Sequence, residues 1–444
     1  MRYFLNIVYL LLLIACSPIW LYRMIAMGKY RNGLAQKILG RVPFRKSDRP
    51  CLWFHAVSVG EVIQLEGLLD GLRESHPEID LVLSTTTSTG YAVAQKKYSD
   101  ILVCYLPFDF TWSVKNALRR IRPAAFLLVE LELWPNLIFE THRRNITLGL
   151  INGRVSERSF RGYRKIRPLI CRLLSCFWFI ATQNETYAGR LKELGSDGLQ
   201  LVVTGSIKYD RIETDRQNAN TEELRSLFQI EERETVWVVG STHEPEEEYA
   251  IQTWKSLRED YPCLRLILVP RHQERFEHVA RLLDQYQLRY VRRSKLTQIR
   301  KDNLQQQTKP IILLDTLGEL GACWGLADIA YVGGSLCQRG GQNMIEPAAF
   351  GAALLFGPNT QNFRATVTML LAENAAIVVS SLQELKIALM ELLEDEIRVK
   401  QLGYRAQKTV LRHRGATQRT LDLIEANCLS PDLETEQIPG DIAA

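Results

Sequence analysis

The sequence has none of the short metal or phosphate motifs that usually identify an enzyme. It has nine cysteines in 444 residues but no CxxC pair, and no zinc-type spacing of histidine and cysteine. It contains neither GxGxxG nor GxxxxGK[ST], which disfavours a dinucleotide-binding domain and a P-loop, and no DxD pair for a metal-held diphosphate. The odd number of cysteines, most of them in apolar segments, indicates reduced buried thiols in a cytosolic compartment. Any phosphate must therefore be held by backbone groups and protein cations, and we expect neither a metal nor another cofactor.

Positive charge is concentrated in two stretches of the first half of the chain. Residues 23–46 contain seven lysines or arginines and no acid, and residues 154–172 contain seven more against one glutamate. The net charge of +5 is modest, so this distribution matters more than the total. Two such stretches favour an anionic partner or a membrane surface. Signatures of RNA-recognition, zinc-finger and helix-turn-helix modules are absent, so we expect no nucleic-acid partner.

The first apolar segment is long enough to reach across a bilayer core. Residues 3–22 carry no charge and consist mainly of leucine and isoleucine. As a helix, a segment of this length spans about 30 Å, which is the thickness of the hydrocarbon core. Arg23, Lys29 and Arg31 follow directly, and the positive-inside rule then places the rest of the chain in the cytoplasm. We predict that residues 1–28 are a membrane anchor helix.

Two features of this segment leave other arrangements open. Pro18 and Asn6 also allow a tilted helix or one that lies in the membrane surface. The run from Leu13 to Cys16 resembles the cleavage box of a lipoprotein, which would export the chain. Residues 19–22 stay apolar beyond that cysteine, and reduced thiols argue for the inside, so the uncleaved anchor is favoured.

After the basic linker, apolar strands alternate with helical segments in two series. The candidate strands of the first series are residues 51–56, 80–85, 101–107, 124–130, 146–152, 177–182 and 200–204. The helical segments between them are 61–75, 111–121, 134–144 and 185–194. The candidate strands of the second series are 235–240, 265–269, 289–292, 311–314, 328–332, 353–356 and 375–379. Continuous apolar runs are typical of parallel strands covered on both faces, and strand–helix–strand units imply right-handed crossovers.

The polar stretch 205–235 separates the two series and is interpreted as a linker. We therefore predict an α/β protein of two doubly wound, Rossmann-like domains, residues 29–208 and 209–425, with residues 426–444 as a flexible tail. The functional site of such a protein lies in the cleft where the carboxyl ends of both sheets meet.

A glycine-rich turn in the second series is the clearest candidate binding loop. The strand 328–332 runs into four glycines within nine residues, and a helix is predicted to begin near Asn343. Such a turn points several backbone N–H groups and a helix dipole at one place, which favours bound phosphate. Glu346 would lie one helical turn inside, where its carboxylate can accept hydrogen bonds from ribose hydroxyls. The plainer interpretation of this turn is structural: the glycines allow close packing, and the helix dipole stabilises the glutamate.

Three further loops leave strand ends of the second series. Residues 240–245, 270–272 and 315–319 follow predicted strands, and Pro245 suits the first turn of a helix. Arg271 stands directly at the carboxyl end of a predicted parallel strand. In a sheet that also carries the glycine-rich turn, this position favours a phosphate contact.

In the first half, acids and a lysine stand at predicted strand ends. Glu61 lies at a helix N-terminus, where the dipole keeps it ionised and able to act as a general base. A simple helix-start glutamate is the competing interpretation, and His55 is interpreted as packed within its strand. Glu130 and Glu132 end another strand, and alternation places them on one face. Lys208 ends the last strand of this series and would point at the cleft.

Together these segments resemble one known family. In chain order they are HAVSVGE (55–61), ELELWPN (130–136), GSIKYD (205–210), STHE (241–244), VPRH (269–272), DTLGEL (315–320) and the glycine-rich turn (331–351). The series is similar to the 3-deoxy-D-manno-octulosonic acid (Kdo) transferases of lipopolysaccharide synthesis, and it runs from the anchor to about residue 420. The resemblance implies a GT-B glycosyltransferase with its two domains facing across a cleft. It also implies transfer of Kdo from CMP-Kdo to the lipid A precursor, with inversion and without a metal.

The resemblance further implies roles for individual residues. Glu61 would be the general base, and Glu130 and Lys208 would stabilise the transition state. The residues implied to hold CMP are Pro270, Arg271, Leu317, Gly318, Glu319, Asn343, Met344, Ile345 and Glu346. The family's usual GGHNPLE reads GGQNMIE here, and Gln342 can donate a hydrogen bond but is never a cation.

The implied partners fit the charge pattern. A bis-phosphorylated acyl disaccharide on the cytoplasmic side of a bacterial inner membrane accounts for an apolar anchor, and its phosphates would meet the arginines of 154–172. Two alternatives remain. One is another GT-B enzyme, either a lipid-linked UDP-sugar transferase or a UDP-sugar 2-epimerase. The other is a membrane-tethered binding protein without activity, against which the clustered acids at strand ends argue.

Overall fold

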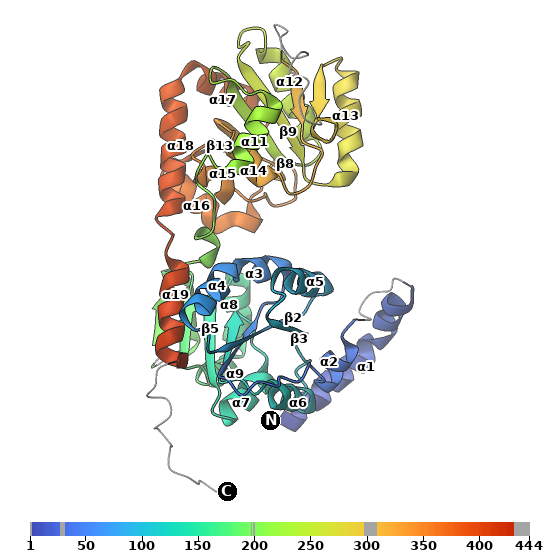
Figure 1. The fold of residues 1–444 in the computed structure, drawn as a ribbon, viewed down its shortest axis with the longest axis vertical. Coiled ribbons are helices and arrows are strands. Elements are labelled where there is room, and N and C mark those ends of the chain that lie inside the picture. Colours follow the sequence, from blue (N-terminus) through green and yellow to red (C-terminus); the bar gives the residue numbers. More distant parts are fainter. Residues whose placement is uncertain (1, 27–31, 197, 199, 297–308, 430–444) are drawn as a thin grey trace, which may run out of the picture. The chain divides into compact units, whose positions relative to one another are not determined.

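The chain forms two compact units, each built on its own parallel sheet (Figure 1). The computed structural model describes residues 2–26, 32–196, 198, 200–296 and 309–429. The first unit holds Met1–Asp210 and Arg414–Ala444, and the second holds Arg211–His413. Helices cover the sheet of each unit, so the predicted α/β architecture of two Rossmann-like sheets is confirmed.

The sheet of the first unit has seven parallel strands in the order β3-β2-β1-β4-β5-β6-β7. They are β1 (Cys51–His55), β2 (Asp80–Thr85), β3 (Leu102–Tyr105), β4 (Ala125–Val129), β5 (Thr147–Gly153), β6 (Phe179–Thr182) and β7 (Gln200–Val203). The order runs outward from β1 to β3 and resumes on the other side of β1 with β4. The switch point of this doubly wound sheet therefore lies between β1 and β4.

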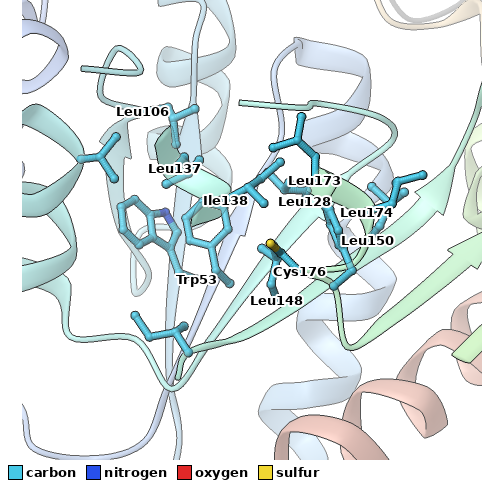
Figure 2. Packing of buried hydrophobic residues seen from close by; sticks show 14 of the residues in the cluster. Trp53, Leu106, Leu128, Leu137, Ile138, Leu148, Leu150, Leu173, Leu174 and Cys176 are labelled. Carbon is cyan, nitrogen blue, oxygen red and sulfur yellow. The ribbon is translucent and has the colours of Figure 1, made fainter. Parts of the chain in front are cut away.

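Successive side chains of the central strand β1 are buried on opposite faces of the sheet. Trp53 joins one core cluster, while its neighbours Leu52 and Phe54 join another. Figure 2 shows the first cluster, in which Trp53 and Leu137 contribute side chains from a strand and from a helix. The Trp53 indole N–H donates to Ser84 Oγ over 2.9 Å, so burial of this large ring leaves no polar atom unsatisfied.

Helices cover both faces of this sheet. They are α2 (Leu34–Leu39), α3 (Val59–Gln64), α4 (Glu66–Ser75), α5 (Ser88–Lys97), α6 (Thr111–Ile121), α7 (Pro135–Arg143), α8 (Glu157–Lys165), α9 (Arg167–Leu174), α10 (Glu185–Leu194) and the 3-10 turn η1 (Ile207–Tyr209). The predicted helices 111–121 and 185–194 have these bounds in the structure. The predicted helix 61–75 is instead divided at Leu65 and begins at Val59, because Ser58 caps its first turn.

The predicted N-terminal helix is present as α1 (Arg2–Ala26). Two of its polar side chains attach it to the first unit: Asn6 Nδ2 donates to Thr111 Oγ1 over 2.9 Å, and the Tyr9 hydroxyl donates to Asp109 Oδ2 over 3.0 Å. Within the part of the chain that the structure describes, no helix is both long and apolar enough to cross a membrane. The first residue and the last two residues of the predicted anchor lie outside that part.

The sheet of the second unit also has seven parallel strands, in the order β10-β11-β9-β8-β12-β13-β14. They are β8 (Thr235–Thr242), β9 (Leu264–Pro270), β10 (Tyr290–Arg292), β11 (Ile311–Leu313), β12 (Ile329–Val332), β13 (Ala353–Phe356) and β14 (Ala376–Val378). The switch point lies between β8 and β12, so the loops that leave these two strands open side by side.

The second unit has helices on both sides of its sheet. They are α11 (Ala219–Phe228), α12 (Glu246–Leu257), η2 (Gln273–Arg275), α13 (Phe276–Gln285), η3 (Arg293–Lys295), α14 (Leu320–Trp324), α15 (Ile345–Ala349), η4 (Gln361–Phe363), α16 (Arg364–Ala372), α17 (Leu382–Glu394) and α18 (Glu396–Leu411). The stretch 205–235, predicted to be a linker, contains α11. Leu224 and Phe228 are buried there, because two apolar residues one turn apart are enough to seat one side of a polar helix.

The end of the chain returns to the first unit. The sequence assigns residues 209–425 to the second domain, but α19 (Ala416–Ile424) packs against α4, and Leu421 joins the core cluster of Leu52. An apolar face identifies a helix but does not show which sheet that helix covers. The π-helical turn η5 (Glu425–Leu429) follows with Cys428 buried, so the predicted tail begins later than residue 426. Residues 430–444 lie outside the described residues.

Candidate active site

The loops that carry the predicted catalytic residues leave strand ends of the first sheet. Glu61 follows β1 and Glu130 follows β4, so these two loops open at the switch point. In doubly wound sheets this is the usual position of a binding crevice. His55, the last residue of β1, is fully buried with Nδ1 3.1 Å from the Ser84 carbonyl oxygen, and burial lowers its pKa to about 4. His55 is therefore a packed strand residue, as predicted.

The side chain of Glu61 is fixed by the start of α3. Its carboxylate accepts hydrogen bonds from the Val57 backbone N–H and the Ser58 hydroxyl, both over 2.8 Å. The Ser58 oxygen in turn accepts the Glu61 backbone N–H over 3.5 Å, so Ser58 caps the first turn of α3. The predicted helix-start role is thus real. It also holds the half-buried carboxylate in one orientation, which a general base requires.

Glu130 has a strained backbone next to this carboxylate. It follows the last residue of β4 with φ at 59°, a left-handed conformation that non-glycine residues rarely adopt and that often occurs at active sites. Burial and the charge of Glu61 raise the pKa of Glu130, while Arg154 and Lys208 lower it. Glu130 therefore lies close to one other carboxylate, that of Glu61, and to two cations, those of Arg154 and Lys208.

Glu132 belongs to the same group of acids, although not by the predicted route. β4 ends at Val129, so strand alternation does not apply to residues 130–132. Burial and the nearby charges of Glu61 and Glu130 raise the pKa of Glu132. The Trp134 indole N–H donates to the Glu132 carboxylate over 2.9 Å and lowers this pKa. The two glutamates are thus brought together by the turn after the strand.

Lys208 supplies a buried cation beside these acids. Burial and the nearby Arg154 lower its pKa to about 8, and Glu130 opposes this shift. Its ammonium group lies 5.0 Å from the centre of the Tyr209 ring. The structure therefore brings Glu61, Glu130 and Lys208 into one cluster, and the catalytic roles that the resemblance implies for them stay predictions.

Arg154 is a member of this cluster that the sequence did not single out. It was grouped with the basic stretch 154–172, yet it directly follows β5 and acts on the pKa of both Glu130 and Lys208. The signal was available, because Arg154 is the first residue after an apolar strand, the same position that identified Arg271.

Three backbone amides of the glycine-rich turn of the second unit already have an acceptor within the protein. The carboxylate of Glu246 already accepts the N–H groups of Gly334, Ser335 and Leu336 over 2.7, 2.9 and 2.9 Å. It also accepts the Tyr331 hydroxyl over 3.0 Å. Glu246 is only 1% exposed, so a buried carboxylate of the protein binds these three amides, which were predicted to bind phosphate.

The short helix α15 places the predicted nucleotide-binding residues beyond this turn. It begins at Ile345, so Glu346 is in its first turn and not one turn inside. Asn343 donates to the Glu346 carboxylate over 2.7 Å and accepts the Ile345 N–H over 3.1 Å. Burial raises the pKa of Glu346, and Asn343 and the nearby Arg271 lower it. Met344 and Ile345 are buried, so neither of these two predicted CMP contacts is open to solvent.

The other predicted nucleotide-binding residues lie in two loops of the same sheet edge. Arg271 is exposed directly after β9, whose last residue is the buried Pro270. Leu317 is 69% exposed, beside Gly318 with φ at 89°. Glu319 accepts from Arg293 over 2.7 Å. This loop leads into α14, which packs against α15, so it extends toward Asn343 and Glu346.

A cationic pocket lies at the same edge of the second sheet and was not predicted. Its volume is about 430 Å³. It is lined by His243, Glu244, His272, Arg275, Cys337, Gln338 and Arg339. These residues come from three loops, which follow β8, β9 and β12, so no spacing in the sequence reveals them as one site. Among the described residues there is no group of three His, Cys, Asp or Glu side chains arranged to hold a metal.

Comparison with known proteins gives the family. Residues 31–211 match the family model of 3-Deoxy-D-manno-octulosonic-acid transferase (kdotransferase). The 3-deoxy-D-manno-octulosonic acid transferase of Haemophilus influenzae is 34% identical over 424 residues, which cover 94% of this chain and 97% of that protein. The chain belongs to the Kdo transferase family. The enzyme of the same description from Bordetella pertussis is 29% identical over 84% of this Kdo transferase and 86% of its own length.

Solved structures add information on the fold. The crystal structure of UDP-GlcNAc 2-epimerase from Neisseria meningitidis, bound to UDP-GlcNAc, matches 85% of this Kdo transferase and 100% of its own chain, with a TM-score of 0.58. Its identity of 13% shows a shared GT-B-like fold and nothing about activity. Family membership makes the chain a glycosyltransferase of lipopolysaccharide biosynthesis, which decides against the UDP-sugar and non-enzymatic alternatives.

Proposed function

We propose that this chain transfers Kdo from CMP-Kdo to the lipid A precursor lipid IVA, with inversion and without a metal. One observation carries the proposal beyond family membership. Glu61 and Glu130 leave the strands that flank the switch point of the first sheet, and they form one charged cluster with Arg154 and Lys208 from loops further along the same edge, an arrangement typical of a reacting centre.

In the proposed reaction, a hydroxyl oxygen of the lipid acceptor attacks the anomeric carbon of Kdo. Glu61 takes the proton of that hydroxyl, the bond from the anomeric carbon to the phosphate oxygen breaks, and CMP leaves with the electron pair. The two hydrogen bonds from Val57 and Ser58 support this role because they hold the carboxylate in one orientation. Lys208 and Glu130 stabilise the charges that develop, the cation facing the anionic groups and the carboxylate facing the oxocarbenium-like carbon.

On the donor side, CMP is held by the loops at the carboxyl edge of the second sheet. Arg271 is exposed and has no carboxylate partner in the parts of the chain that are described, so its guanidinium is available to the single phosphate. Glu346, oriented by Asn343, accepts from the ribose hydroxyls, and the exposed Leu317 covers the base. One arginine and local backbone groups suffice for a monophosphate ester, which needs no metal.

The membrane assignment rests on α1 and on the basic surface of the first unit. Ile7, Leu11 and Ile14 of α1 are exposed, although Asn6 and Tyr9 hold the helix against the unit. An apolar stripe on a helix attached in this way is suited to lie in the cytoplasmic surface of the inner membrane. The arginines of α8 and α9 are then available for the acceptor's phosphates.

The decisive experiment is a transfer assay with freshly generated CMP-Kdo and tetraacyl disaccharide bisphosphate, read by mass spectrometry of the lipid. We expect products that carry one or more added Kdo residues, and the masses also count them. Transfer from a UDP-sugar with none from CMP-Kdo would overturn the proposal. Addition of EDTA should leave the rate unchanged if no metal takes part.

A further inference from the structure

The cationic pocket of the second unit has a charged group that the fold does not use. Arg339 is exposed at the tip of the glycine-rich turn and lines the pocket. Its guanidinium has no carboxylate partner within the described residues. By contrast, Arg275 on the opposite loop is held by Glu247 over 3.0 Å and by Glu244 over 3.2 Å. The charge of Arg275 is therefore neutralised within the protein, while the guanidinium of Arg339 is available to bind a ligand.

A buried histidine of the pocket also lacks a partner. His243 is 7% exposed, and its Nε2 atom has no hydrogen-bond partner among the described residues. Its ring meets that of His272 edge to face, with centres 5.2 Å apart. Burial, His272 and the nearby arginines lower the pKa of His243 to about 4, so it is neutral at pH 7 and has one N–H to donate. A buried ring nitrogen without a partner, on a residue that lines a pocket, indicates a ligand.

The pocket adjoins the proposed phosphate contact without including the nucleotide residues. Arg271 precedes the lining residue His272, and its charge lowers the pKa of both His243 and Glu346. Asn343 and Glu346 do not line the pocket. Arg271 is therefore close both to the residues proposed to hold ribose and to the pocket, so a ligand with its phosphate on Arg271 can extend into the pocket.

The chemistry of the donor supplies a group for this pocket. In CMP-Kdo the anomeric carbon carries two anionic substituents, the phosphate ester and the carboxylate of the keto acid. Because both groups are bonded to one carbon, a phosphate placed on Arg271 puts the carboxylate directly beside it, where it needs a second cationic site. A neutral hexose would gain little from an unpaired guanidinium, whereas a carboxylate forms short, charge-assisted hydrogen bonds with it.

We propose that the carboxylate of the donor sugar binds in this pocket, with Arg339 as its cationic partner and His243 Nε2 as a second donor. This proposal rests on the proposed donor. It makes the pocket the place where the enzyme distinguishes a keto-acid sugar from other nucleotide-linked sugars, because only the keto acid brings a second anion.

The test compares affinities for CMP, which lacks the carboxylate, and for CMP-Kdo, which has it. Both are measured without acceptor, by displacement of a fluorescent CMP derivative from the full-length protein. For the wild type we expect CMP-Kdo to bind more tightly than CMP. In Arg339→Gln we expect the affinity for CMP-Kdo to fall roughly tenfold to a hundredfold, with that for CMP unchanged within about twofold. Arg339→Lys should recover part of the loss.

The matched control is Arg281→Gln, an exposed arginine of α13 that does not line the pocket and should change neither affinity. An equal loss of CMP and CMP-Kdo affinity in Arg339→Gln would show that the pocket holds the phosphate, and unchanged affinities would show that it holds neither group. Either result overturns the proposal while Kdo transfer by the wild type still stands. If the wild type binds neither ligand and transfers no Kdo, the proposed function itself has failed.

Discussion

Glu61 shows how one residue can serve both the fold and the proposed reaction. Its carboxylate accepts the Val57 N–H and the Ser58 hydroxyl at the start of α3, and a glutamine there can accept the Val57 N–H and donate to the Ser58 oxygen. Glutamine cannot accept a proton. Exchange of glutamate for glutamine therefore separates the two roles at this position, which few catalytic acids allow.

We predict that Glu61→Gln lowers kcat for Kdo transfer by roughly 10² to 10⁴ while the affinity for CMP and the thermal midpoint stay as in the wild type. The measurement is steady-state transfer to lipid IVA alongside calorimetric titration with CMP. Glu66→Gln, one turn further along at the start of α4, is the matched control and should retain full turnover. Wild-type turnover in Glu61→Gln would exclude Glu61 as the base.

Lys208 makes a second residue-level prediction because burial brings its pKa to about 8. The cation is present below that pH and is lost above it, so a reaction that needs the charge should slow about tenfold per pH unit beyond pH 8. In Lys208→Arg, whose guanidinium stays protonated, we expect this decline to move up by at least about one pH unit.

The pH profile of kcat for the wild type, Lys208→Arg and the exposed Lys192→Arg tests this expectation. The Lys192 variant should follow the wild type. An identical alkaline decline in all three proteins would assign it to another group, such as the acceptor.

At the scale of elements, the strands were predictable and the contacts between loops were not. The central parallel strands are short apolar runs with both faces buried, and residues 80–85 and 353–356 were predicted with the bounds they have. Ends differ by one or two residues elsewhere, because the last apolar residue of a run often belongs to the following turn, as at Glu130. The break at Leu65 has no glycine or proline to mark it.

The candidate site was predictable where strand ends carry it. Glu61, Glu130 and Lys208 follow strands of one sheet, and parallel strands bring their carboxyl ends to one edge whatever the rest of the sequence does. The amides of Gly334, Ser335 and Leu336 are not available to phosphate because Glu246, a residue 88 positions away from Gly334, accepts them, and the phosphate role of the rest of the turn stays a prediction. Spacing within a motif contains no information on such a distant partner.

The contact of α12 with the glycine-rich turn gives an element-level prediction. Glutamine at 246 has one acceptor oxygen where the carboxylate accepts from Gly334, Ser335 and Leu336, and its NH₂ group would face donors. We expect Glu246→Gln to destabilise the second unit by about 3–5 kcal/mol and to lower its thermal midpoint by about 6–15 °C.

Differential scanning calorimetry measures this change. Glu373→Gln, at a half-exposed ion pair with Arg412 in the same unit, is the control and should shift the midpoint by less than about 2 °C. A midpoint in Glu246→Gln equal to that of the control would mean that the turn does not depend on this carboxylate.

For the whole molecule, the chain leaves the first unit after Asp210 and returns to it at Arg414. Asp210 accepts the backbone N–H of Gly415 over 2.7 Å and also that of Thr417, so the point of exit is tied to the point of return. The first unit is thus closed by residues from both ends of the sequence, which a boundary drawn from strand counting alone does not reveal.

We predict that Leu421→Ala weakens the first unit without affecting the second. Leu421 is 6% exposed and packs in the core cluster with residues of α4, so its truncation should cost about 2–4 kcal/mol. Hydrogen exchange should speed up in α4 by about 30-fold to several hundred-fold and stay unchanged in β8. Tyr404→Ala, at an exposed position of α18, is the control, and equal exchange changes in both units would contradict the division.

The anion that Glu246 provides has a consequence for turnover. A loop whose amides depended on substrate for their hydrogen bonds would have to refold each time product departs. Here the amides of Gly334, Ser335 and Leu336 keep their acceptor when the nucleotide is gone. This part of the donor site can therefore release product and bind new donor without changing its backbone conformation. Little binding free energy is then lost to ordering the loop.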